Sequence, residues 1–218
     1  MKRLQKILST SLILINLIPL GIRAETKNPP PQKPKQSTSI LQAVLSLFKS
    51  SERRMMTRGE EVCLISPGNS GEEIIWGDRL LFVWWGEISE SEINLYQDEQ
   101  LVWTKIVSAN TQTIAYDGES LEPGSTYDWE LVANDKKYRQ TIVLLEQASQ
   151  KAIARDLVNL DSQLKSNKAT AEEIAIARAK YFLDQELGSD ALQQLYLVKN
   201  PSADLTSQID DFEERLCK

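Results

Sequence analysis

The chain has 218 residues, of which 41% are apolar and 26% are charged, and its formal net charge at pH 7 is −6. This composition is that of a folded globular protein and argues against disorder throughout the chain. The acidic balance argues against nucleic-acid binding, because phosphate contacts need clustered lysine and arginine. The chain has no histidine, which removes the commonest general base and the commonest metal ligand. We therefore expect no cofactor and no metal site.

The first 24 residues have the pattern of a secretory signal peptide. Lys2, Arg3 and Lys6 precede an uncharged, mostly apolar stretch over 7–20, and Ala24 is a small residue ahead of a cleavage point. This stretch is short for a membrane-spanning helix, which needs about 20 residues. We predict cleavage after Ala24 and export to the periplasm or the extracellular space. The alternative is an uncleaved anchor.

A proline-rich spacer over 25–39 leads into a short amphipathic helix and a basic lead-in over 40–58. The spacer has no apolar residue to bury and reads as an extended linker. In the second segment apolar residues recur at helical spacing, at Ile40, Leu41, Val44, Leu45 and Phe48. This helix either docks on the folded body or, with the arginines that follow it, makes a peripheral contact with an anionic membrane or an acidic partner.

Between 60 and 145 the apolar period changes to two, which indicates β-strands. Short candidate strands with turn signals between them lie at 62–66, 74–76, 80–85, 93–96, 101–105, 111–116, 126–133 and 138–144. The strongest of them, 80–85, is apolar throughout, as a strand buried on both faces would be. Several short strands at regular spacing predict an antiparallel β-sandwich.

From 146 to 218 the apolar period becomes helical. Thr170 and Glu173 have the spacing of a capping box. We expect Gly188 to end the helix that follows, and Ser189 with Asp190 to cap the next one. The chain is therefore predicted to have an α+β fold, a β-sandwich followed by a C-terminal helical bundle.

The segment 121–131, Leu-Glu-Pro-Gly-Ser-Thr-Tyr-Asp-Trp-Glu-Leu, resembles the corner before the sixth strand of fibronectin type III and related Ig-like domains. In that pattern a tyrosine hydroxyl, here of Tyr127, bonds back to the preceding chain. The resemblance implies an Ig-like sandwich over about 60–145, with Trp84 or Trp85 in the core between the sheets. That fold hosts many functions and names none.

The whole arrangement also resembles a family of exported cyanobacterial proteins of unknown function. The shared features are an Arg-Gly lead-in at 58–59, a Cys-Leu-Ile-Ser-Pro-Gly strand start at 63–68, a Phe-Val-Trp strand at 82–84 and a Pro-Gly-x-x-Tyr-x-Trp corner at 123–129. A helical C-terminus follows. The resemblance implies export but assigns no activity.

The tryptophans are the candidate binding residues. Trp84 and Trp85 are adjacent and must point to opposite sides of their strand. One can fill the core, while the other lies under the helical tail or, together with Trp103, forms a surface that binds a sugar or a protein.

A carboxylate cluster supports a second hypothesis, since paired carboxylates can hydrolyse glycosides. Its members surround the 80–85 strand and are Glu72, Glu73, Glu87, Glu90 and Glu92. The ordinary interpretation is a solvated rim of the sheet. We therefore expect an envelope binding module without a catalytic site, whose partner is an envelope protein or a cell-wall component. The alternative is a carboxylate-dependent hydrolase of cell-wall glycan.

The two cysteines are Cys63, at the first strand, and Cys217, next to the last residue. Export to an oxidising compartment favours a disulfide between them. Such a bond would hold the helical tail against the sandwich as a single body. The alternative is a buried Cys63 and a free thiol at Cys217.

Overall fold

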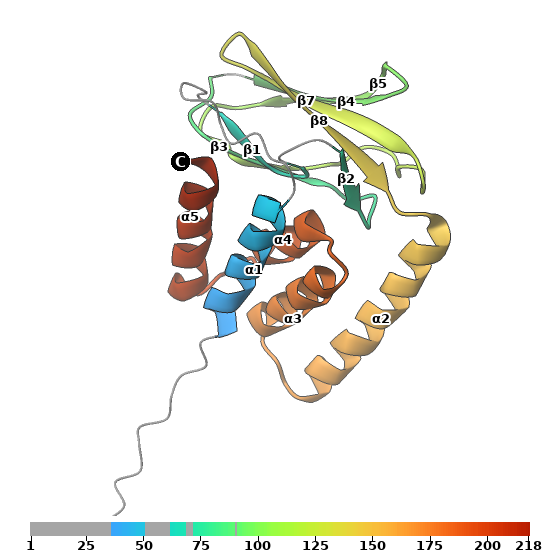
Figure 1. Cartoon of the computed structure of the whole chain (residues 1–218), viewed down its shortest axis with the longest axis vertical. Coiled ribbons are helices and arrows are strands. Elements are labelled where there is room, and N and C mark those ends of the chain that lie inside the picture. Colours follow the sequence, from blue (N-terminus) through green and yellow to red (C-terminus); the bar gives the residue numbers. More distant parts are fainter. Residues whose placement is uncertain (1–35, 51–61, 69–71, 90) are drawn as a thin grey trace, which may run out of the picture. The chain divides into compact units, whose positions relative to one another are not determined.

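The computed structural model describes residues 36–50, 62–68, 72–89 and 91–218 (Figure 1). The predicted signal peptide, most of the spacer and the three arginines of the basic lead-in lie outside these residues. In the described part of the chain, one helix is followed by eight strands and then four helices. The prediction of an α+β fold in which strands precede C-terminal helices is confirmed.

The eight strands form two sheets. One sheet has the order β1 (Cys63–Ser66), β3 (Leu81–Trp85), β6 (Thr113–Ala115). The other has the order β2 (Glu72–Ile75), β8 (Lys136–Leu144), β7 (Thr126–Ala133), β4 (Ser91–Gln97), β5 (Gln100–Val107). We refer to residues 62–145 as the two-sheet unit. Each predicted strand is present, with its ends shifted by a few residues at most.

The sheets are mixed, so the prediction of a purely antiparallel arrangement is wrong for one pair of strands. β2 runs parallel to β8, with Glu72 opposite Thr141 and Ile75 opposite Leu144. The chain leaves β1 in the three-stranded sheet, crosses to the other sheet and joins its edge beside β8. Alternation of apolar residues is the same for both strand directions, which is why the sequence pattern does not reveal this pairing.

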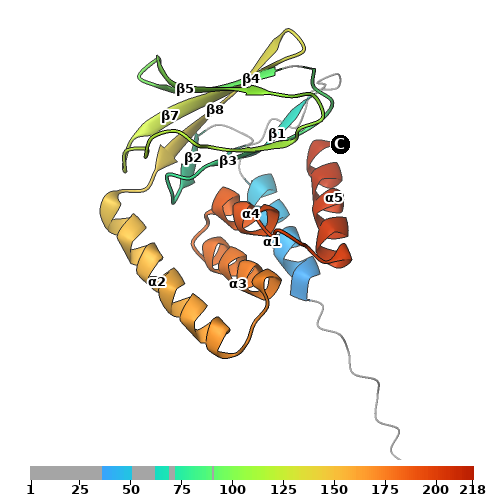
Figure 2. The ribbon, with the colours of Figure 1, turned by 180° about the vertical axis from the view of Figure 1, so that it is seen from behind.

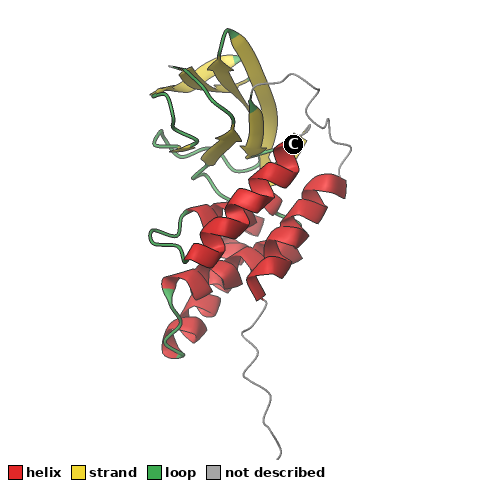
Figure 3. Ribbon diagram, turned by 90° about the vertical axis from the view of Figure 1, so that its left-hand side faces the viewer, coloured by secondary structure: helices red, strands yellow, loops and turns green. Residues whose placement is uncertain are grey.

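The three-stranded sheet is covered on both faces. One face shares a hydrophobic core with the five-stranded sheet, and Phe82 and Trp84 contribute to it from β3. The other face packs on the helices through Leu81 and Val83. Figure 3 shows the strands gathered on one side of the structure and the helices on the other. This double burial explains why the 80–85 segment is apolar throughout.

The helical layer contains both ends of the described chain. Its helices are α1 (Gln36–Ser50), α2 (Gln147–Ser166), α3 (Ala171–Asp184), α4 (Gly188–Tyr196) and α5 (Ala203–Cys217). α1 packs against α3, α4 and α5 (Figures 1 and 2), and its first four residues fall within the predicted spacer. None of the helices in the described ranges is both long and apolar enough to cross a membrane.

A disulfide joins Cys63 of β1 to Cys217 of α5, with 5.8 Å between their Cα atoms. This is the pairing expected from the cysteine count. Both cysteines are buried in the core that the helices share with the three-stranded sheet. Residues 35–218 accordingly form one compact unit, and the helical tail is not an independent domain.

Local backbone signals explain the turns. Asp98 and Glu99, between β4 and β5, both have positive φ, as do Asn134 and Asp135 between β7 and β8. Two consecutive residues with positive φ are what a tight hairpin turn of type I′ requires. The predicted tyrosine corner is also present, since the backbone N–H of Glu122 donates to the Tyr127 hydroxyl over 2.9 Å.

The helix ends are predicted correctly in one place and wrongly in another. Thr170 and Glu173 form the predicted capping box at the start of α3. Gly188, however, does not end α3, which stops at Asp184, but begins α4. A Cβ atom at Gly188 would lie 2.9 Å from the Phe48 ring of α1. The glycine is therefore needed for a close approach between helices rather than for a helix stop.

Candidate functional site

A groove opens at the end of the two-sheet unit where three chain connections meet. These are the β3–β4 connection, the β5–β6 connection and the β7–β8 turn. The groove has a volume of about 860 Å³ and is lined by Trp85, Gly86, Glu87, Ile88, Ser89, Gln112 and Asn134. Its wall combines an aromatic ring with amide, hydroxyl and carboxylate groups, and a concave surface of this composition can hold a polar ligand. We call it the loop-end groove.

Asn134 holds the connections of the loop-end groove in place. Its amide nitrogen donates to the backbone carbonyl of Glu87 over 3.0 Å. Its amide oxygen accepts from the backbone N–H and from the hydroxyl of Ser89, each over 3.3 Å. On the opposite side, the backbone N–H of Trp84 donates to the carbonyl of Gln112 over 3.1 Å. Side chains on this wall are thus displayed from a hydrogen-bonded frame.

Trp85 lies between the loop-end groove and the helical layer. It is half-buried, packs against the core of the helical layer, and has the ammonium group of Lys218 at 5.4 Å from its ring centroid. Of the two adjacent tryptophans, Trp85 is therefore the one under the helical tail, and part of it also lines the groove. The cation–π contact ties the C-terminal residue to the site.

Trp84 is a core residue, so the prediction that it binds a ligand is wrong. Its side chain is fully buried between the two sheets. The cause is the alternation of the strand, which sends Trp84 inward when Trp85 faces the helices. In this role Trp84 is the tryptophan that the Ig-like resemblance expects in the core.

Trp103 lies on β5, away from the groove lining. It stacks on Phe82 with 5.6 Å between ring centroids, and its indole nitrogen donates to Asp117 over 3.0 Å. Hydrogen bonds from Lys105 and Trp103 lower the pKa of Asp117. Half-buried and engaged at both ends, Trp103 offers only part of its surface, and a binding role for it stays a prediction.

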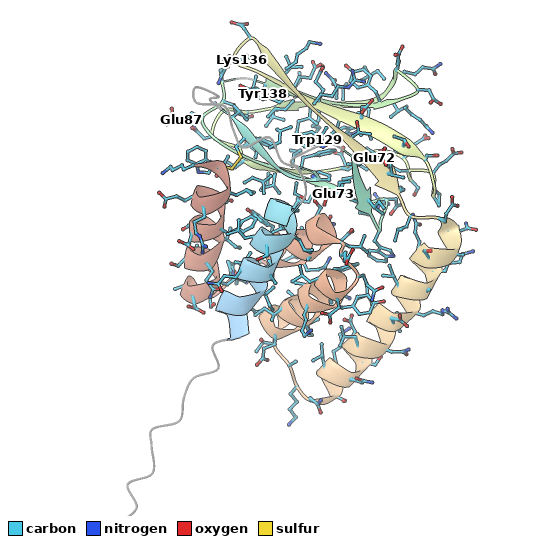
Figure 4. The ribbon with its side chains drawn as sticks, in the orientation of Figure 1. Glu72, Glu73, Glu87, Trp129, Lys136 and Tyr138 are labelled. Carbon is cyan, nitrogen blue, oxygen red and sulfur yellow. A yellow bond between two sulfur atoms is a disulfide. The ribbon has the colours of Figure 1, made fainter. Side chains whose placement is uncertain are left out.

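The predicted carboxylates do not gather into one pair. Glu92 is on β4 and Glu72 is on β2, and the strands β7 and β8 lie between them. The strand register places the two glutamates three strand spacings apart across the sheet and four residues apart along the strands. This amounts to about 20 Å, whereas glycosidase carboxylates are about 5–9.5 Å apart. Figure 4 likewise places Glu87 away from Glu72 and Glu73.

Other contacts of these carboxylates agree with a structural role. Glu73 accepts a hydrogen bond from the backbone of Ser189 in α4, and Glu92 accepts one from the Asn94 amide. Glu90 lies outside the described residues. Glu87 is the member of the predicted cluster that lines the loop-end groove. Within the described ranges, no group of three or more potential metal ligands is present.

The apolar face of α1 is not available to a membrane. Its apolar side chains are buried in the core of the helical layer, at Ile40, Leu41, Val44, Leu45 and Phe48. Of the two sequence interpretations, docking on the folded body is therefore the one that the structure supports. The arginines on which the membrane interpretation also depended lie outside the described residues.

A buried polar junction joins β2 to α4, and the sequence pattern does not predict it. Asp190 is buried and accepts a 2.8 Å hydrogen bond from the backbone N–H of Trp76. The backbone N–H of Ser189 donates to Glu73 over 3.2 Å, and its hydroxyl accepts from Gly68 over 3.2 Å. The expected cap by Ser189 with Asp190 is thus wrong, because both residues lie inside α4 and the N-cap position is Leu187, which makes no side-chain capping bond. The cap comes from Glu73, 116 residues away, and no local signal could identify it.

Comparison with known proteins assigns no family. No protein-family model matches the chain, and no curated protein is similar to it. Extracellular domains 3–5 of Drosophila OTK share 12% identity over 43% of this chain and 38% of that one, with a TM-score of 0.27. An extracellular fragment of EsaA from Streptococcus gallolyticus shares 15% identity over 82% of this chain and 56% of that one, with a TM-score of 0.18. The chain thus spans less than two thirds of either structure, and likenesses this weak carry no inference.

Proposed function

We propose that this chain is an exported binding module of the cell envelope, an Ig-like sandwich that holds a cell-wall component in its loop-end groove. The observation that carries the proposal is the groove itself, in which Trp85, Glu87 and Gln112 face one concavity. In the described part of the chain, Glu72 of β2 and Glu92 of β4 are too far apart to act as a pair of glycosidase carboxylates. We therefore favour binding over hydrolysis.

The strand order supports the Ig-like assignment. In an Ig-like sandwich, strands A, B and E face a sheet built from G, F, C and C′. The order β1-β3-β6 corresponds to A, B and E, and β8-β7-β4-β5 corresponds to G, F, C and C′. β2 then continues the first strand on the other sheet. Tyr127, at the start of β7, occupies the position of the corner tyrosine.

The position of the groove also fits a binding role. It lies where the β3–β4 connection and the β7–β8 turn meet, which correspond to the B–C and F–G loops. In variable Ig domains these loops form part of the antigen-binding end. Loops displayed from a rigid sandwich are a common place for binding residues.

Export is supported by two independent features. The N-terminal residues have the order of a signal peptide, and the Cys63–Cys217 disulfide is of a kind that persists in oxidising compartments. The resemblance to exported cyanobacterial proteins agrees with this location and stays a proposal. The periplasm and the extracellular space are both compatible with these features.

The side chains of the groove favour a hydroxyl-rich ligand. Glu87, Ser89 and Gln112 are exposed, and they offer donors and acceptors that match sugar hydroxyls. Trp85 adds an aromatic surface that can contact the apolar face of a sugar ring. A cell-wall glycan is therefore the partner that we propose, ahead of an envelope protein.

The test is binding of the purified exported chain to isolated cell-wall glycan, measured by co-sedimentation. The double variant Glu87→Ala/Gln112→Ala removes two exposed polar side chains without opening the core. We expect it to weaken binding about tenfold or more, since each lost hydrogen bond contributes about 1 kcal/mol.

The matched control is Glu119→Ala/Ser120→Ala. Both residues are exposed and follow β6, whose Ala115 pairs with Leu81 at the start of β3, so they lie at the opposite end of the sheets. We expect unchanged glycan binding. If the exported chain does not sediment with glycan, or if both double variants bind as well as the original chain, the groove is not the binding site. A tag pull-down from the envelope would then identify a protein partner.

A further inference from the structure

β5 is an unusually accessible edge of the five-stranded sheet. It is the last strand in that sheet (Figure 1), and no other described strand pairs with its outer side. Among the described residues, six large hydrophobic side chains are exposed, and three of them are on β5. These are Leu101, Val102 and Ile106, with exposed fractions of 54%, 46% and 69%. An exposed, long and apolar edge strand is a template for pairing with another chain.

The other sheet edges are short or begin with charged residues, whereas the protection of β5 is a β-bulge near its start, where Leu101 and Trp103 lie opposite the neighbouring residues Tyr96 and Leu95. β2, at the opposite edge, has four residues and begins with two glutamates. β1 and β6, the edges of the smaller sheet, have four and three residues. β5 has eight residues, no proline and one charged residue, Lys105, whose ammonium group bonds to Asp117 of its own chain. Charged residues, proline and a short length normally prevent pairing at a sheet edge. β5 is long, has no proline and has a single charged residue.

We propose that β5 pairs antiparallel with β5 of a second copy, about a two-fold axis at Thr104. An axis there places each residue opposite the one equally far on the other side of Thr104. Thr104 then faces itself, Val102 faces Ile106 of the second copy, and Trp103 faces Lys105 of the second copy. Threonine pairs, apolar pairs and a cation beside an indole are each favourable across strands. The strand is therefore complementary to itself in this register.

Neighbouring registers are less favourable. An axis at Lys105 would place the two lysines directly opposite each other, which is destabilising. An axis at Trp103 would oppose Ile106 to Gln100 and Val102 to Thr104, and so would pair apolar with polar side chains. The Thr104 register alone keeps the two lysines apart while matching both exposed β-branched residues. Pairing joins the two five-stranded sheets into one continuous sheet, an arrangement typical of a closed two-fold dimer.

This dimer is independent of the proposed glycan site, because β5 contributes no residue to the loop-end groove. The first test measures the molar mass of the purified exported chain by light scattering over a range of concentrations. A monomer–dimer equilibrium is expected, and a chain that stays monomeric at all concentrations overturns the proposal.

Charge variants then test the register. In Val102→Lys/Ile106→Lys, each introduced lysine faces the other across the two-fold axis, so we expect dimerisation to weaken about tenfold or more. In Val102→Glu/Ile106→Lys, opposite charges face each other, so dimerisation should recover. The control Val158→Lys changes an exposed apolar residue on α2 and should leave dimerisation unchanged. A dimer that is insensitive to the lysine pair, or one that the opposite-charge pair fails to restore, contradicts the pairing.

Cross-linking gives a second, independent readout. Thr104→Cys places two cysteines opposite each other, at the Cα separation of about 4.5–5.5 Å found in antiparallel pairs, which a disulfide can span. Ile106→Cys places its two cysteines four residues apart along the paired strands, about 13 Å, which a disulfide cannot span. We expect a covalent dimer from the first variant only. Equal cross-linking of both variants, or cross-linking of Ile106→Cys alone, overturns the register.

Discussion

The side chain of Asp190 in α4 accepts a 2.8 Å hydrogen bond from the backbone N–H of Trp76, which lies 114 residues earlier in the chain. This contact joins the helical layer to the end of β2. The pKa of Asp190 is raised to about 7, mainly by burial and in smaller part by the nearby charge of Glu73, while the hydrogen bond from the backbone N–H of Trp76 acts in the opposite direction. The junction between sheet and helices therefore contains a group that titrates near neutral pH.

The first prediction is that the titration of Asp190 stabilises the protein as the pH falls from about 7 to about 4. The pKa of Asp190 rises from 3.8 in the unfolded chain to about 7 in the folded one. Between these values the folded state binds more protons, so the free energy of unfolding decreases with rising pH. A single group gives a slope of at most about 1.4 kcal/mol per pH unit. The raised pKa of Glu213, caused mainly by burial, acts in the same direction.

Urea unfolding at several pH values measures this dependence. Asp190→Asn keeps the size of the side chain and removes its titration, so we expect a much flatter profile between pH 4 and 7. The exposed control Glu119→Gln should keep the original slope. An Asp190→Asn profile as steep as that of the unmodified chain would mean that the slope comes from other groups.

The second prediction concerns the disulfide. Cys63 and Cys217 are 154 residues apart in sequence, and cross-linking so long a loop restricts the unfolded chain strongly. The chain-entropy model gives about 5 kcal/mol for such a loop, and measured losses for native disulfides are about 2–5 kcal/mol. We expect Cys63→Ser/Cys217→Ser to lower the free energy of unfolding by an amount in that range.

Thiol chemistry checks the bond itself. The unreduced protein, denatured and treated with a thiol reagent, should show no reactive thiol, and the reduced protein should show two. Reductant should destabilise the unmodified chain and leave the double serine variant unaffected. Two reactive thiols in the unreduced monomer would refute the bond.

The strands were predictable because their alternation is local, and the tyrosine corner because Tyr127 and its partner Glu122 are five residues apart. The junction of Glu73 with Ser189 was not predictable, because the two residues meet only after both layers have formed. Gly188 illustrates the same limit, since its reason is the Phe48 ring of another helix. The loop-end groove was predictable in part. Its residues come from separate connections, and the sequence pattern pointed to only two of them, Trp85 and Glu87, as candidate functional residues.

The third prediction is that Tyr127→Phe destabilises the two-sheet unit by about 1–3 kcal/mol. The Tyr127 side chain is buried, and its hydroxyl accepts the hydrogen bond from the Glu122 N–H. Removing the hydroxyl leaves that backbone donor without its partner, which has a cost in this range.

Urea unfolding at constant pH measures the loss of stability. The matched control Tyr96→Phe changes a half-buried tyrosine on β4 and should cost less. Equal losses in the two variants would show that the corner hydrogen bond has no special role.

The last prediction links Glu73 to the titration of Asp190. The negative charge of Glu73 raises the pKa of Asp190, so Glu73→Gln should lower that pKa towards its ordinary value. The pH range over which stability falls should then shift to lower pH. Glutamine retains an oxygen that can accept the hydrogen bond from the Ser189 N–H, so the cap of α4 can persist.

In the double variant Glu73→Gln/Asp190→Asn, the dependence of stability on pH should be as flat as in Asp190→Asn alone, because the carboxyl group whose pKa Glu73 shifts is absent. Urea unfolding across pH 4–8 for both single variants and the double variant gives the comparison. A shift that persists in the double variant would mean that Glu73 acts on stability without Asp190.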